Sequence, residues 1–213
     1  MARINITKPV DAEIINKIEA KYYECETATR NVAYELSKGY DLSNDSVKYQ
    51  LDRLHKFYPI YNSLKDDFTK NVVYPIVKEN GGNGTCTWNI AFDKKEVNIS
   101  MDLGEWNDET TDADLSIPAE KAAEIEAAKN DSEIYGDIIS YLGTNGLIQS
   151  VPESVMDELN DLQVKAMRDY GNGRNMISND VVIPYLSEKG ITDTVTWNLD
   201  FKTGKVTFVG KIG

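Results

Sequence analysis

The first third of the chain has a helical pattern. Between residues 14 and 36, apolar or small side chains recur every three or four positions, and this spacing predicts a long helix with one stripe towards a partner helix. Pro9 fits the first position of this helix, and Asp11 and Glu13 are favoured in its first turn. Gly39 lies where a glycine commonly ends a helix.

Further helices are predicted from their start signals. The cap residues Asn44 to Ser46 begin a second helix, and Pro59 should kink or split it. In the second half, Pro118 and Pro152 each open a helix. The run Gly171-Asn172-Gly173 should break the later one.

After the helices, each half changes to a period of two. Apolar and polar side chains alternate over residues 85–92 and 97–101, and again over 195–201 and 206–208, which predicts two β-hairpins. Gly204 fits a turn position with positive φ. Because a lone hairpin is only marginally stable, each should pack on its own helices or join the other in a four-stranded sheet. The predicted fold class is α+β.

The strongest signal is an internal repeat. Residues 71–104 align without a gap onto residues 180–213 at an offset of 109, and about a third of the positions are identical. The identical pairs include Pro75 and Pro184, Trp88 and Trp197, Phe92 and Phe201, and Gly104 and Gly213. Further upstream, Ile18-Glu19-Ala20 is repeated as Ile125-Glu126-Ala127.

We therefore predict a tandem duplication. Each unit has two helices forming an αα-hairpin, a short Pro-containing helix and a β-hairpin, and a pseudo-twofold between the units is the economical arrangement. The expected boundaries are 1–104 for the first copy, 105–117 for an acidic linker and 118–213 for the second copy.

Charge divides the two copies. The chain has a formal net charge of −12. Residues 1–104 carry 14 basic and 15 acidic side chains, whereas residues 105–213 carry 9 and 20. Direct binding of nucleic acid or of an anionic membrane is disfavoured, because both need a basic surface. Binding to a basic protein surface is compatible with this charge.

Candidate chemistry is sparse. His55 is the only histidine, and pairing it with Cys25 is conceivable, although Cys25 fits the apolar stripe of its helix. No zinc-ligand spacing, calcium loop or phosphate loop is present, since the glycine-rich run 80–84 lacks the Lys-Ser/Thr that a phosphate loop requires. We predict no catalytic residue, cofactor or metal. Cys25 and Cys86 are expected to be reduced thiols.

The start of the sequence lacks the apolar segment of a secretory signal, and no run of about 20 apolar residues suits a membrane span. We therefore expect a cytoplasmic protein.

The favoured hypothesis is a non-enzymatic protein-interaction module that docks on a basic protein surface, such as one that itself holds nucleic acid. A small inhibitor or adaptor from a bacterium or its mobile elements, acting in the host cytoplasm, fits this composition. Five acidic residues would steer the encounter and two aromatic residues would anchor it. These are Glu105, Asp108, Glu109, Asp112 and Asp114, with Trp106 and Tyr135 as the anchors.

Two alternatives remain open. A duplicated unit with a hairpin in each copy also suits an assembly component, such as a virion or other particle protein that binds copies of itself. An enzyme with a carboxylate site is the third hypothesis. Acidic side chains are so abundant that choosing a catalytic pair would be arbitrary.

Overall fold

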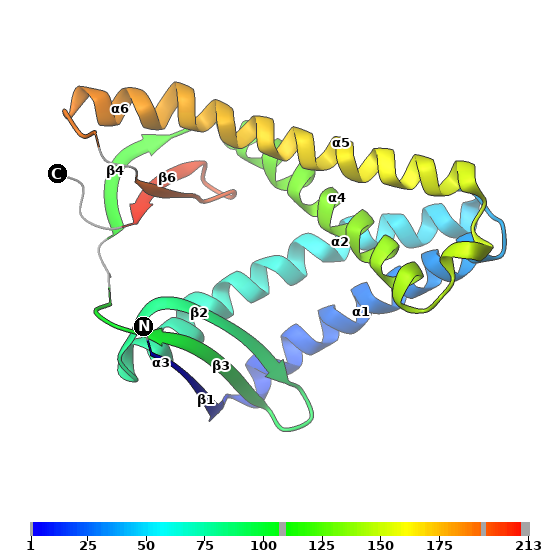
Figure 1. The fold of residues 1–213 in the computed structure, drawn as a ribbon, viewed down its shortest axis with the longest axis horizontal. Coiled ribbons are helices and arrows are strands. Elements are labelled where there is room, and N and C mark those ends of the chain that lie inside the picture. The colour runs from blue at the N-terminus through cyan, green and yellow to red at the C-terminus, as the bar shows by residue number, and fades with distance from the viewer. Residues whose placement is uncertain (1, 107–109, 193–194, 210–213) are drawn as a thin grey trace. The chain divides into compact units, whose positions relative to one another are not determined.

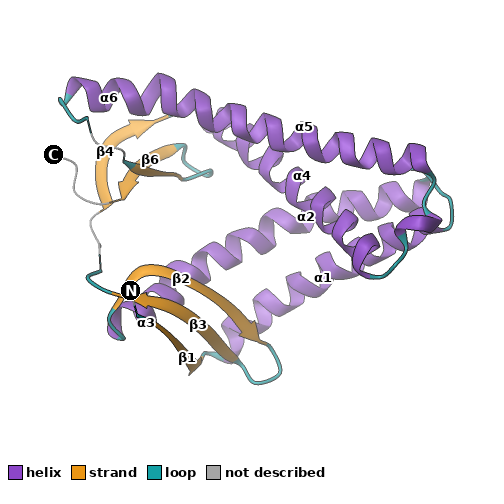
Figure 2. Cartoon of the chain, in the orientation of Figure 1, coloured by secondary structure: helices purple, strands orange, loops and turns teal. Residues whose placement is uncertain are grey.

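The computed structural model describes residues 2–106, 110–192 and 195–209. Within these residues the fold is α+β, as predicted, with four long helices, two short ones and two three-stranded antiparallel sheets (Figures 1 and 2). The elements of the first half are β1 (Arg3–Pro9), α1 (Ala12–Ser37), α2 (Asp45–Phe68), a π-helical turn (Thr69–Val73), α3 (Tyr74–Glu79), β2 (Gly82–Ala91) and β3 (Glu96–Leu103).

The second half has the same order of elements with one 3₁₀ turn added. Its elements are β4 (Thr110–Ser116), α4 (Ala119–Thr144), the 3₁₀ turn (Ile148–Ser150), α5 (Glu153–Ile177), a π-helical turn (Ser178–Val182), α6 (Ile183–Glu188), β5 (Thr196–Leu199) and β6 (Lys205–Val209). Helices α1 and α4 are both 26 residues long, and each π-helical turn has five residues.

In space the chain forms two compact units. The first comprises residues 1–28 and 51–107, and the second comprises residues 29–50 and 108–213. These units are groups in space, whereas the boundaries at 104 and 118 mark copies along the sequence and stay a prediction.

The start of α1 differs from the prediction. Pro9 is the last residue of β1, not the first of a helix. The segment is a strand because Ile4 and Ile6 alternate with polar residues and pack against the first core. Asp11 then caps α1, since its carboxylate accepts a hydrogen bond from the backbone N–H of Glu13 at 2.7 Å.

The predicted end of α1 is confirmed. Gly39 has a φ of +93°, and the N–H groups of Gly39 and Tyr40 donate to the carbonyls of Leu36 and Glu35. This is the arrangement in which a left-handed glycine satisfies the last carbonyls of a helix. At the start of α2, the side chain of Asn44 accepts from the N–H of Ser46.

Prolines within the helical runs do not stop them. Helix α2 continues past Pro59, so the predicted split is wrong. Both π-helical turns lie directly before a proline-containing short helix, with Pro75 as the second residue of α3 and Pro184 as the second residue of α6. A π turn carries one extra residue per turn and is found where the regular hydrogen-bond ladder is disturbed. Proline, which has no N–H to donate, is such a disturbance.

The predicted break at Gly171-Asn172-Gly173 is also wrong, because α5 continues to Ile177. Gly173 is buried, and a Cβ atom there would lie 2.6 Å from Cγ1 of Ile125 on α4. The glycine therefore lets α4 and α5 approach closely, and this contact outweighs its low helix propensity.

Both predicted hairpins are present, β2–β3 and β5–β6, and Gly204 has the predicted positive φ, at +72°. Each hairpin gains a third strand that the sequence did not reveal. The strand orders are β1-β3-β2 and β4-β6-β5, so the hairpins lie in separate sheets and not in one four-stranded sheet. Strand β4 falls in the segment 105–117 that we expected to be a linker.

Each sheet packs one face on its own helices. Most of the buried residues of the two cores occupy equivalent positions, at an offset of 107 in the first helix and 109 elsewhere. Six pairs match in this way, namely Ile18, Phe68, Val73, Val77, Val97 and Ile99 in the first core with Ile125, Ile177, Val182, Leu186, Val206 and Phe208 in the second, while Met101, Ile117 and Ala122 are buried without a match among the described residues of the two cores. Among the described residues, no helix is long and apolar enough to cross a membrane.

Candidate functional site

The residues that we predicted for binding lie in several settings. Glu105 is exposed in the segment that follows β3. Asp114 is exposed in β4, with a φ of +53°, at the shift in pairing with β6. The backbone of Asp112 pairs with Thr207, and its side chain lies outside the description. Asp108 and Glu109 lie outside the described residues.

Trp106 is not the exposed anchor that we expected. Its side chain is half-buried against the first core, with its ring 5.6 Å from that of Tyr74 in an edge-on contact. The indole also lies over the backbone of Gly84, where a Cβ atom would be in ordinary van der Waals contact with it at 3.6 Å. Its apolar area is therefore largely used within the fold.

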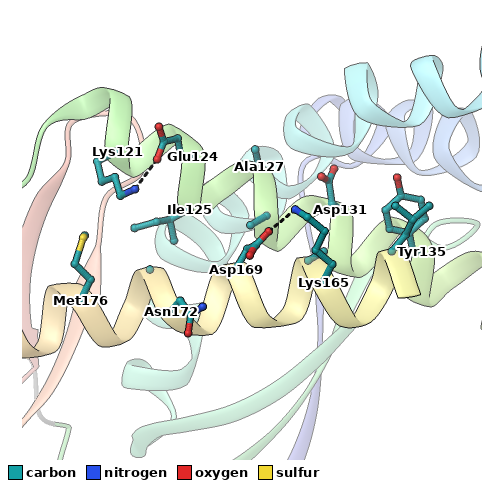
Figure 3. A pocket seen from close by; sticks show the side chains of 14 residues that line it. Lys121, Glu124, Ile125, Ala127, Asp131, Tyr135, Lys165, Asp169, Asn172 and Met176 are labelled. Carbon is teal, nitrogen blue, oxygen red and sulfur yellow. Dashed lines mark hydrogen bonds and ion pairs between the residues drawn. The ribbon is translucent and has the colours of Figure 1, made fainter. Parts of the chain in front are cut away.

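Tyr135 lies on a groove in the second unit. The groove runs between α4 and α5 and has a cavity volume of about 640 Å³ (Figure 3). Small residues on the two helices leave this space, because short side chains do not fill the gap between neighbouring helices. They are Ala127, Ala128, Ala166 and Gly173, with Ile125, Leu162 and Met176 as larger apolar lining residues.

The helices that form the groove have clear sequence causes. Pro118 precedes α4 and Pro152 precedes α5, each with an extended backbone. Glu120 and Glu153 lie in the first turns, where negative charge is favourable. The two helices thus begin where the sequence predicted them.

Charge is unevenly distributed around the groove. Helices α4 and α5 together carry eleven acidic and five basic side chains. Two lysines at the rim are paired within their own helix, Lys121 with Glu124 at 2.6 Å and Lys165 with Asp169 at 2.7 Å. Such exposed pairs contribute little to stability. These two ion pairs neutralise the lysines at the rim, and the remaining carboxylates of the two helices outnumber their remaining basic side chains.

The aromatic residue and a carboxylate lie side by side on α4. Burial raises the pKa of the Tyr135 phenol, and the nearby charge of Asp131 raises it further. Tyr135 therefore stays neutral over the physiological range. It offers a ring face and a hydroxyl next to a negative charge, which together suit a lysine or arginine side chain.

The groups considered for catalysis lie in different settings. Cys25 is buried in α1, whereas His55 is exposed on α2. Burial raises the pKa of the Cys86 thiol, which disfavours the nucleophilic thiolate. Among the described residues, no group of three or more His, Cys, Asp or Glu side chains is placed to hold a metal ion.

Sequence reasoning selected Tyr135 as an isolated aromatic residue and missed the groove around it. The small residues of α4 and α5 carry the signal, but they form an adjacent pair on α4 and a pair seven positions apart on α5, and the sequence does not reveal the mutual register of the two helices. Gly173 was interpreted as a helix breaker. Comparisons with protein-family models, with curated proteins and with solved structures each found no match.

Proposed function

We propose that this protein is a non-enzymatic interaction module whose acidic second half docks on a basic surface of a partner protein. The observation that carries the proposal is the groove between α4 and α5, whose lining combines apolar residues with three carboxylates and two lysines and lies on two helices that are acidic as a whole. A small inhibitor or adaptor of a bacterium or its mobile elements, acting in the cytoplasm, remains the biological setting that we propose.

The groove suits a basic side chain in two respects. Its small floor residues admit a long apolar stem, and Asp131 and Tyr135 receive the charged end. Arginine and lysine bury their stems in this way while their charges stay near water or a counter-ion. Acidic residues elsewhere on the second half would raise the association rate.

We also propose that the two halves arose by duplication of one unit. The support is the repeated order of elements, the equivalent core positions and the matched π-helical turns. The proposal explains why the sequence repeat is carried by buried residues, while net charge differs by an order of magnitude between halves. One copy keeps a near-neutral surface and the other has become acidic.

The direct test uses a defined basic probe, a fluorescein-labelled helical Lys/Ala peptide, measured by fluorescence anisotropy over a range of salt concentrations. We expect binding that weakens steeply with salt. The variant Glu124→Gln/Asp131→Asn should weaken binding at least tenfold, since the loss of even one charge-assisted contact costs about 1.5–3 kcal/mol and about 1.4 kcal/mol corresponds to a factor of ten.

The matched control is Asp66→Asn/Asp67→Asn in the first half, which changes net charge equally. Equal loss of affinity in both double variants would show that net charge alone attracts the peptide, and the docking site would be rejected. Light scattering at low and high salt completes the test. A large, salt-resistant oligomer would support the assembly alternative in its place.

A further inference from the structure

A second groove follows the free edge of the first sheet. Strand β2 is an edge strand, because β3 lies on one side of it and the sheet order ends there. The groove beside it has a cavity volume of about 650 Å³ and is lined by residues of β2 on one wall and of α1 and α2 on the other. Ile18 and Tyr22 come from α1, and Tyr61 and Lys65 come from α2.

The geometry of this groove suits an extended chain. Both the outward residues Thr87 and Asn89 and the inward residues Trp88 and Ile90 line it, so it runs along the edge of the strand itself and not over one face. An edge strand offers a row of backbone N–H and C=O groups to a further strand. A peptide that adds a strand at such an edge gains affinity from the backbone and specificity from alternate side chains.

Aromatic rings from the helices and from the β2 region pack together around the groove. The ring of Tyr22 lies 6.1 Å from that of Tyr61 and 5.4 Å from that of Phe92, and Trp88 lies 5.1 Å from Phe68. These distances are typical of favourable aromatic pairs. The cluster holds the wall in place before any ligand binds, which reduces the entropic cost of binding.

One cation in this groove lacks a carboxylate partner. The Lys65 ammonium lies 5.2 Å from the ring centre of Tyr61, and in the described part of the chain it forms no ion pair. By contrast, Lys17 and Lys95 pair with Glu13 and Glu19. Lys65 is also the one lysine or arginine among the residues that line this groove. Asp66 also lines this groove, and it is treated below as a control.

The second sheet has a cation at the equivalent position, and among the described residues this cation contacts a ring of the edge strand and not a ring of its own helix. At an offset of 109, Lys65 becomes Arg174, which lies on α5 with its guanidinium 4.0 Å from the ring centre of Trp197. Trp197 is on β5, the edge strand of the second sheet. Tyr61, Trp88 and Asn89 recur as Tyr170, Trp197 and Asn198, whereas Asp66 is replaced by Asn175. The pairing of a cation with aromatic rings at a sheet edge is therefore shared although the net charge of the halves differs.

We propose that the groove at the β2 edge binds an extended peptide as a fourth strand, with an aspartate or glutamate of the peptide placed at Lys65. Charge complementarity selects the occupant, because the unpaired ammonium calls for a carboxylate. Lys65 comes from the helical wall, so the peptide carboxylate lies on the inward side, between apolar neighbours two residues away on either side. This site is separate from the groove between α4 and α5 and goes beyond the docking proposed above.

The test uses two synthetic peptides, acetylated and amidated, with the sequence Thr-Val-Thr-Asp-Thr-Val-Thr and the same sequence with Lys in place of Asp. Binding is followed by backbone amide NMR shifts of residues 85–91, which report on this edge alone. We expect the Asp peptide to bind about tenfold more tightly than the Lys peptide. An Asp peptide N-methylated at alternate amides should lose binding, because strand pairing needs those N–H groups.

Protein variants make the test specific. Lys65→Gln should remove the preference for the Asp peptide, and Lys65→Glu should invert it. Asp66→Asn, the matched control, should keep the preference. The proposal is overturned if neither peptide shifts residues 85–91, if both bind equally to the unaltered protein, or if N-methylation has no effect. None of these results bears on the groove between α4 and α5.

Discussion

The inner faces of the two sheets match position by position, whereas their outer faces match in the edge strands β2 and β5 and differ in the central strands β3 and β6. On the inner faces, Val97 and Ile99 of the first sheet correspond to Val206 and Phe208 of the second, and all four are buried. On the outer face of the first sheet, Asn98 joins both neighbouring strands. It accepts a hydrogen bond from the Thr7 hydroxyl at 2.7 Å and donates to the Asn89 side chain at 3.0 Å.

The equivalent of Asn98 in the second sheet is Thr207. A hydroxyl donates and accepts through one oxygen atom, whereas the amide of Asn98 reaches its two neighbours through separate atoms, its oxygen towards Thr7 and its nitrogen towards Asn89. The edge strand of the second sheet is also shorter, since β5 has four residues and β2 has ten. The difference teaches that the sequence repeat preserves the packing of each sheet on its helices, while the outer face of the central strand has diverged.

The largest effect should come from emptying equivalent core positions. We expect Phe208→Ala to lower the free energy of unfolding by about 3–5 kcal/mol and Ile99→Ala by about 2–5 kcal/mol, because each leaves a cavity. Urea unfolding, with hydrogen exchange as the readout, measures the free energy of unfolding of both variants. Tyr49→Ala, at a residue that is 61% exposed, is the control. A loss below about 1 kcal/mol at either core position would contradict the equivalence of the two cores.

Substitutions in the two hairpin turns should change the free energy of unfolding by less, and by different amounts in the two halves. The left-handed residue is Lys95 in the first turn and Gly204 in the second, with φ values of +53° and +72°. A Cβ atom at Gly204 would overlap the carbonyl oxygen of Ile117. Gly204→Ala should therefore cost more than the about 1–2 kcal/mol of a left-handed backbone alone. Gly190→Ala isolates that cost, since Gly190 has a φ of +70° and open space around it.

The reverse substitution, Lys95→Gly, should change the free energy of unfolding by less than about 1 kcal/mol, because relief of the left-handed backbone offsets the loss of a half-buried ion pair. That pair joins Lys95 to Glu19 at 2.6 Å. Thermal unfolding of the variants measures these differences. Equal costs for Gly204→Ala and Gly190→Ala would show that the second turn can move away from Ile117.

The smallest effect concerns the groove between α4 and α5. At an offset of 107, Tyr135 corresponds to Ala28, which is fully buried, so the two halves use this position differently. The pKa of Tyr135 is raised in the folded protein, so folding favours the neutral phenol. The contribution of Tyr135 to the free energy of unfolding is therefore present below the pKa of the unfolded chain, about 10, and is lost as pH rises further. Urea unfolding should show the wild type losing more stability above that pH than Tyr135→Phe. Parallel pH profiles would contradict this assignment.

Local patterns were sufficient to predict much of the fold. The alternation around Trp88 and Trp197 predicted both hairpins and their inner faces, and Gly39 and Pro118 marked helix ends correctly. Strands β1 and β4 were missed because their partners are distant in the chain. Thr7, for example, pairs with Asn98, and only Ile4 and Ile6 give β1 an apolar face. Such non-local pairing has no local signature.

The candidate sites were less predictable. The equivalence of Lys65 and Arg174 becomes visible only when α2 is aligned with α5 at an offset of 109. Helices α1 and α4, which come before them, align at an offset of 107, so one fixed offset does not cover both helix pairs. The groove at Tyr135 depends on how closely α4 approaches α5. That approach is controlled by Gly173, whose helix-breaking tendency suggested the opposite structure. The duplication itself stays a prediction.

The π-helical turns have a consequence for the phase of each helical run. Successive buried residues are five positions apart across the turn, Phe68 to Val73 and Ile177 to Val182, and four apart after it, Val73 to Val77 and Val182 to Leu186. One residue of an α-helix corresponds to a rotation of about 100°. The wider turn absorbs this rotation and keeps the buried side chains in line. Each helical run therefore tolerates single substitutions in this turn better than the loss of one residue, which would rotate α3 or α6 out of its core.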